Sequence, residues 1–175
     1  MTIIDTHTHI DQLEDISAAL SRASQAGVTD IMTLSVDLES IKKTLSIAGQ
    51  YKEPRIHPCL GIHPGMIHKQ EAELAFSFMK EHIHEAVAIG ETGLDYWYKW
   101  ARKDALEQEK QKDFFRFHLK LAHDFDLPVV IHARAAWKDC FEMTITAGIK
   151  RALFHWYSGP LDVLERILEA GYYVS

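Results

Sequence analysis

Two histidines one residue apart lie at the end of the first strand-like run of the chain, IIDTHTH, which spans positions 3 to 9. Successive side chains of a strand point to opposite faces, so Asp5, His7 and His9 share one face. Two imidazoles placed in this way can bind one metal ion. The spacing alone is weak, because the chain has 11 histidines and another such pair, His82 and His84, follows a helix-like run.

Three later strand-like runs also end on a residue that can bind a metal. They are AVAIGE, which ends at Glu91, PVVIH, which ends at His132, and RALFH, which ends at His155. In βα barrels, functional side chains lie where strands give way to the loops that follow them. Any one of these residues alone could be a buried, hydrogen-bonded side chain, but their shared position predicts a common metal site.

Strand-like and helix-like runs alternate along the chain. Strands are expected at about 2–7, 29–36, 55–63, 86–91, 128–132, 151–155 and from 171. Helices are expected at about 16–26, 38–50 and 104–125. Further helices are expected before the fourth strand and after the fifth and sixth strands. This alternation predicts a parallel sheet. No glycine-rich phosphate turn follows the first strand, which favours an α/β TIM-type (β/α)8 barrel over a doubly wound sheet. No linker interrupts residues 1–175, so one domain is expected.

The composition restricts the class of protein. With 47% hydrophobic and 25% charged residues, the chain can form a sizeable core. Cys59 and Cys140 have no C-x-x-C spacing, and no leader-like or membrane-spanning run occurs, so we expect a cytoplasmic protein without membrane contact. The net charge of −6 argues against sequence-independent binding along a nucleic acid, which needs a basic surface, but permits binding of a single phosphate group in a pocket. The oligomeric state stays open.

Five motifs, in order along the chain, resemble the TatD-type metal-dependent hydrolases, a deoxyribonuclease family of amidohydrolase-like barrels. The motifs are DTHTH at 5–9, GIHP at 61–64, GETGLDY at 90–96, VIHAR at 130–134 and HWYSG at 155–159. The resemblance implies that His7, His9 and Glu91 hold one divalent ion, and that Glu91, His132 and His155 hold a second, with Glu91 bridging. It also implies a cation-dependent deoxyribonuclease activity, often exonucleolytic.

The family pattern continues beyond this sequence. Its eighth strand ends on an aspartate in a Thr-Asp-Ser-Pro or Thr-Asp-Ala-Pro motif, whereas the sequence stops at Ser175 before any such motif. Barrels of this type usually need roughly 200 residues or more. We therefore expect a C-terminally incomplete barrel of about seven strands, with open edges that could pair with another chain and little activity of its own.

A site with two divalent ions suits ester hydrolysis. One ion lowers the pKa of a bound water from about 15.7 to near 7, while both hold the oxygens of the transition state. Mixed imidazole and carboxylate donors fit Zn, Mn or Ni, and Mg is possible where a substrate phosphate completes its shell. The sequence does not choose among these ions.

Four residues near the expected ligands have two interpretations each. Arg134 could bind a phosphate with both arms of its guanidinium or form a salt bridge on the rim. His63 could contact a phosphate or fix its loop, and Asp95 could orient a ligand imidazole or cap its loop. Tyr96 could stack on an unpaired base or, the more common use, pack against helices.

The expected function is a metal-dependent phosphodiesterase, with DNA or another phosphodiester as substrate and with Glu91 and Arg134 in the catalytic machinery. One alternative is a hydrolase of carbonyl esters or amides, such as an aminoacyl-tRNA deacylase or a lactonase, because the same ligands serve those reactions. A second alternative is a metal-binding fragment without catalytic activity.

Overall fold

The computed structural model describes residues 2–175, which form one parallel sheet of seven strands in the order β1 to β7. The strands are β1 Ile3–Thr8, β2 Val28–Leu34, β3 Arg55–Leu60, β4 Ala88–Asp95, β5 Val129–Arg134, β6 Ala152–His155 and β7 Tyr173–Val174. The helices are α1 Ile16–Gln25, α2 Leu38–Gln50, α3 Ala72–Glu81, α4 Ala105–Asp124, α5 Trp137–Thr146 and α6 Leu161–Glu169. Short 3₁₀ turns lie at Ile10–Gln12, Pro64–Met66 and Ile83–Glu85.

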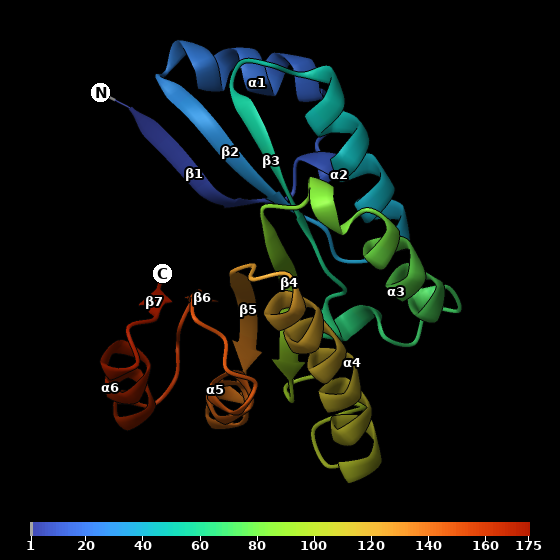
Figure 1. Ribbon diagram of the computed structural model, residues 1–175, viewed down its shortest axis with the longest axis vertical. Helices are drawn as coiled ribbons and strands as arrows, with labels where there is room; N and C mark the ends of the chain where they lie inside the picture. The colour runs from blue at the N-terminus through green and yellow to red at the C-terminus, as the bar shows by residue number, and fades with distance from the viewer. Residues whose placement is uncertain (1) are drawn as a thin grey trace.

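The strands follow an arc with the helices on its outer side, and β1 and β7 stand at its two ends (Figure 1). All six neighbouring pairs are parallel, and each connection between them contains a helix. Within residues 2–175, β1 and β7 do not pair with each other, so the sheet forms a half-barrel. The predicted TIM-type α/β fold with about seven strands is confirmed.

Three predicted strand ends are wrong. Strand β3 ends at Leu60, three residues before the predicted end at His63. Strand β4 continues to Asp95 and β5 continues to Arg134, so Glu91 and His132 lie inside their strands and not at the ends. The reason is tertiary, because the residues after Glu91 stay paired with β5 up to the Asp95 and Arg134 pair. Gly93 permits this close pairing: its φ is +141°, and a Cβ there would collide with the carbonyl oxygen of His132.

One extra residue in β4 changes the direction of its side chains. Ile89 pairs with Val129 and Thr92 pairs with Ile131, so three steps along β4 match two steps along β5. Such a bulge bends the strand and re-aims the side chains beside it. Glu91 lies inside this irregular stretch.

Aspartates set the starts of three helices. Asp15 accepts the N–H of Ala18 at the start of α1, and Asp104 accepts the N–H of Leu106 at the start of α4. Asp37 and Ser40 form a reciprocal capping box at the start of α2. Each cap pairs a backbone N–H that the helix itself leaves free, which stabilises the helix by about 1 kcal/mol.

The core lies between the sheet and the helices. Helix α4 contributes Phe115, Leu119 and Ala122, which recur at helical spacing and are at most 2% exposed. They pack with strand residues such as Ile89 and Phe154 in one cluster. Burial of each large side chain contributes about 1.5 to 3 kcal/mol. Among residues 2–175, no helix is long and apolar enough to cross a membrane.

Stability should fall in acid because of His118 on α4, which is completely buried. Burial lowers its pKa from 6.5 to about 4. Below pH 6.5, His118 therefore binds a proton in the unfolded chain but stays neutral in the folded chain. The contribution of His118 to the free energy of unfolding is complete above pH 6.5 and is lost as the pH falls to about 4. The decline from this residue is on the order of 3 kcal/mol.

The check is urea unfolding at several pH values between 7 and 4. His118→Gln, which cannot titrate, should show a shallower decline over this range than the wild type. An identical pH profile for the two proteins would refute the assignment.

Candidate metal centre

Glu91 lies at the centre of a group of histidines and is 5% exposed. Its Oε2 is 3.5 Å from His7 Nε2 and 3.3 Å from His9 Nε2, and its Oε1 is 3.1 Å from His132 Nδ1. Both carboxylate oxygens thus face imidazole nitrogens. The structure thus brings these four predicted side chains together.

The backbone around Glu91 is held by the segments that follow β2 and β3. Its N–H donates to the carbonyl of Ser35, directly after β2, at 3.0 Å. The Ser35 hydroxyl in turn accepts the N–H of Gly61, after β3, at 2.9 Å. A Cβ on Gly61 would lie only 2.6 Å from the carbonyl carbon of Gly90, so glycine is needed where these segments meet.

Hydrogen bonds orient the imidazole of His9. Its Nδ1 lies 2.8 Å from the carbonyl oxygen of Leu34, at the end of β2. Because a carbonyl can only accept, Nδ1 carries the hydrogen and Nε2 faces Glu91. The carboxylate raises the pKa of His9.

His132 has a carboxylate at each ring nitrogen. Nδ1 faces Glu91, and Nε2 lies 3.0 Å from Asp95 Oδ2. Burial lowers the pKa of His132, but the hydrogen bonds to Asp95 and Glu91 outweigh this effect and raise it to about 9. The histidines likewise outweigh the effect of burial on Glu91 and hold its pKa well below the usual range.

This charge arrangement fits a divalent ion. A neutral imidazole has one N–H, so in His9 and His132 the nitrogen that faces Glu91 needs either a second proton or a metal cation in the gap. In addition, His7 Nδ1 is buried without a hydrogen-bond partner among the described residues. Two sets of three donor atoms lie within 4.8 Å of one another: His7, His9 and Glu91, and His63, Glu91 and His132.

His63 lies next to the donors but is arranged as a hydrogen-bond donor. Its ring centre is 4.3 Å from that of His132. Its Nδ1 accepts the N–H of Gly65 at 3.0 Å, so the neutral ring carries its hydrogen on Nε2. Burial and the neighbouring His132 lower its pKa to about 4, which keeps the ring neutral at pH 7. An N–H of this kind suits an anionic oxygen better than a metal ion.

His155 reaches the site from the end of β6. Its ring stacks on that of His7, with 3.4 Å between ring centres and 10° between planes. Burial and the proximity of His7 lower its pKa to about 4. It lines the same cavity as Glu91, but it belongs to neither donor set.

Asp95 makes a contact with an imidazole and a contact with the backbone of its own loop. Its Oδ2 contacts His132, and its Oδ1 accepts the N–H of Trp97 at 2.9 Å, which caps the turn after β4. At 2% exposure it is as buried as the core. Carboxylates that hold a ligand histidine in this way commonly fix its ring orientation.

Arg134 lies at the rim of a cavity of about 560 Å³, which His7, His9, His63, Glu91, His132 and His155 also line. Its guanidinium carbon is 5.5 Å from the ring centre of Trp97. No carboxylate among residues 2–175 forms an ion pair with it, so the salt-bridge interpretation has no support and the guanidinium is free for a ligand.

The structure does not place Tyr96 in the cavity. Its hydroxyl donates to Asp139 Oδ2 on α5 at 2.9 Å, and its ring packs against the main core. This hydrogen bond directs the side chain toward α5, so of the two interpretations of Tyr96 the structure favours packing, and the substrate contact assigned to it has no support in this geometry. Sequence reasoning missed Trp156 and Ser158, which line the cavity directly after His155.

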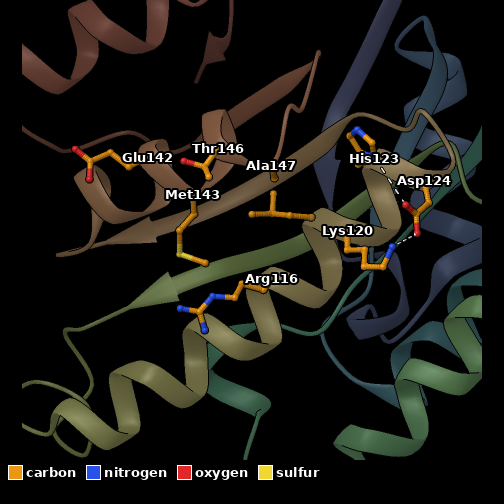
Figure 2. A pocket seen from close by; sticks show the side chains of 9 residues that line it. Arg116, Lys120, His123, Asp124, Glu142, Met143, Thr146 and Ala147 are labelled. Atoms are coloured by element: carbon orange, nitrogen blue, oxygen red, sulfur yellow. Dashed lines mark hydrogen bonds and ion pairs between the residues drawn. The ribbon is translucent and has the colours of Figure 1, made fainter.

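A second hollow, of about 580 Å³, lies on the outer surface between α4 and α5 (Figure 2). The long side chains of Arg116, Lys120 and Met143 border it. Lys120 pairs with Asp124 at 2.8 Å, as the dashed line in Figure 2 shows. None of the predicted site residues lines this hollow.

Known proteins resemble this chain over nearly all of its length. The family model described as TatD related DNase matches residues 4–175. YjjV of Escherichia coli K12, named an uncharacterized metal-dependent hydrolase, is 31% identical over 98% of the chain and 66% of its own length. The human deoxyribonuclease TATDN3 is 25% identical over 99% of the chain and 67% of its own length.

The fold agrees with these matches. The crystal structure of YjjV superimposes with a TM-score of 0.83 at 30% identity, covering 98% of the chain and 66% of YjjV. The chain thus spans about two thirds of the length of these relatives. On the match over residues 4–175, the chain belongs to the TatD related DNase family.

Proposed function

We propose that this protein is a divalent-metal-dependent phosphodiesterase that acts on DNA. The observation that carries the proposal is the buried carboxylate of Glu91 with imidazole nitrogens at both oxygens, beside a cavity with an unpaired arginine. The membership of the family and the naming of human TATDN3 as a deoxyribonuclease support it.

Two divalent ions would bind around Glu91. His7, His9 and Glu91 would hold the first, and Glu91 and His132 would hold the second, with His155 as its further ligand. Nitrogen and carboxylate donors of this kind fit Zn, Mn or Ni, and Mg where phosphate oxygens complete the shell. When bound, such ions activate water and polarise the phosphate.

The protein's own groups would position the substrate. Arg134 would bind nonbridging phosphate oxygens with both arms of its guanidinium, and the Nε2–H of His63 would donate to the same phosphate. Asp95 holds the ring of His132 with Nδ1 toward Glu91. Because its pKa is held low, Glu91 stays ionised and serves as a ligand, not as the group that accepts a proton.

Metal content should depend on Glu91. The wild type is expected to bind close to two divalent ions per chain, because Glu91 links both donor sets. Glu91→Gln should lose both ions, whereas His132→Gln should lose mainly one. Elemental analysis after dialysis and calorimetric titration measure this.

Glu109→Gln is the matched control for the Glu91 variant. Glu109 is an exposed glutamate of α4, paired with Arg116, and its substitution makes the same change of charge. It should leave the metal content unchanged. Retention of two ions by Glu91→Gln would disprove the bridging role.

Cleavage of DNA should depend on the bidentate geometry of the Arg134 guanidinium. Arg134→Lys keeps the charge but loses the bidentate geometry, so kcat/KM should fall about 100-fold, the effect of one lost charge-stabilising contact. The assay uses single-stranded and duplex DNA with Mg²⁺, Mn²⁺ or Zn²⁺, beside a carboxylic ester and an amide.

Arg102→Lys is the control for this experiment. Arg102 also lies over the ring of Trp97, at 4.8 Å, but it does not line the cavity. Its variant should cleave DNA at close to the wild-type rate. Hydrolysis of only the ester or the amide by the wild type would overturn the proposal in favour of carbonyl chemistry.

A further inference from the structure

Helix α4 carries two completely buried polar side chains, Gln111 and His118. They are seven residues apart, about two turns, and so lie on one face of the helix. Neither residue lines the cavity around Glu91. Each nevertheless hydrogen-bonds the backbone at the carboxyl end of a strand that leads into the site.

Gln111 holds the last residue of β4. Its Oε1 accepts the N–H of Asp95 at 2.8 Å, and its Nε2 donates to the carbonyl of Asp95 at 2.9 Å. The side-chain amide thus pairs with the backbone of Asp95 as a neighbouring strand would. The carboxylate of the same Asp95 contacts Nε2 of His132, so Gln111 is two contacts away from the proposed metal ligand.

His118 holds the segment that leads to His63. Its Nδ1 lies 2.6 Å from the carbonyl oxygen of Phe114, and its Nε2 lies 3.0 Å from the N–H of Ile62. The carbonyl can only accept, so Nδ1 carries the hydrogen and Nε2 accepts from Ile62. Only the neutral ring in this one tautomer makes both contacts, and Ile62 directly precedes His63.

The two contacts matter because the groups they satisfy are buried. Without Gln111 or His118, the N–H of Asp95 or of Ile62 would lack its partner in the interior, and the segment would shift to find another. Active sites lose function when their ligands are displaced by about 1 Å. The two segments lead to different parts of the site, Asp95 to the metal ligand His132 and Ile62 to the proposed phosphate contact His63.

We propose that Gln111 and His118 are positioning residues with separate tasks: Gln111 sets the geometry of metal binding through Asp95, and His118 sets the phosphate contact through His63. The inference rests on the proposed metal site. It makes helix α4 a scaffold for the chemistry as well as part of the core.

The test uses the protein loaded with Co²⁺, whose visible absorption reports the coordination geometry. Gln111→Met should lower the affinity for Co²⁺ about tenfold, the effect seen when partners of metal ligands are removed, and should change the spectrum. His118→Leu should leave the Co²⁺ spectrum and affinity unchanged. Instead, it should weaken the binding of inorganic phosphate and raise the KM for DNA about tenfold, with kcat less affected.

Two further variants separate positioning from loss of stability. His118→Gln restores an acceptor for the N–H of Ile62 and should recover phosphate binding. Phe115→Leu removes volume from the same buried face of α4 without a hydrogen bond to either segment, and should lower the unfolding temperature but change neither the spectrum nor phosphate binding.

The outcomes are distinct. If the wild type binds no Co²⁺, the proposed metal site itself is overturned. If the wild type binds Co²⁺ but Gln111→Met and Phe115→Leu give the same spectrum, or if His118→Gln binds phosphate no better than His118→Leu, the positioning roles are overturned while the metal site stands.

Discussion

The carboxylate of Glu91 imposes the strongest constraint on this structure, because it is ionised and almost completely removed from water. A buried charge without compensation costs several kcal/mol, so partners must surround it. The partners come from distant parts of the chain: His7 and His9 from the end of β1, and His132 from β5. The curvature of the sheet is what brings these strands around one carboxylate.

Strand β4 meets this constraint by giving up regular geometry. Its extra residue opposite β5 and the left-handed backbone of Gly93 allow it to stay paired as far as Asp95 while Glu91 points into the site. The same stretch supplies two carboxylates, Glu91 and Asp95, to the two nitrogens of one imidazole. A regular strand would not need glycine at this position, so Gly93 is explained by the irregular pairing that carries β4 to Asp95.

The order of the strands and the residue types suited to bind a metal were readable from the sequence because they depend on local pattern. Alternation of strands and helices predicted the barrel-like sheet, and the positions of His7, His9, Glu91 and His132 predicted their meeting. Contacts that depend on tertiary packing were not readable. No local pattern in the sequence indicates the extended pairing of β4 or the direction of Tyr96 toward Asp139. The same is true of the burial of Gln111 on α4, a helix with many charged residues.

The charges around Glu91 can be balanced in two ways, and both use the same atoms. Without a metal ion, a second proton on His132, whose pKa is raised to about 9, provides positive charge between nitrogen and carboxylate. The carboxylate of Glu91 raises the pKa of His9 in the same direction. A divalent ion bound to the same nitrogens replaces these protons, as metals generally do when they bind imidazole. In both cases Glu91 remains ionised and Asp95 remains paired with His132. The fold therefore holds these side chains together without a metal ion, which would reduce the reorganisation that the proposed metal binding requires.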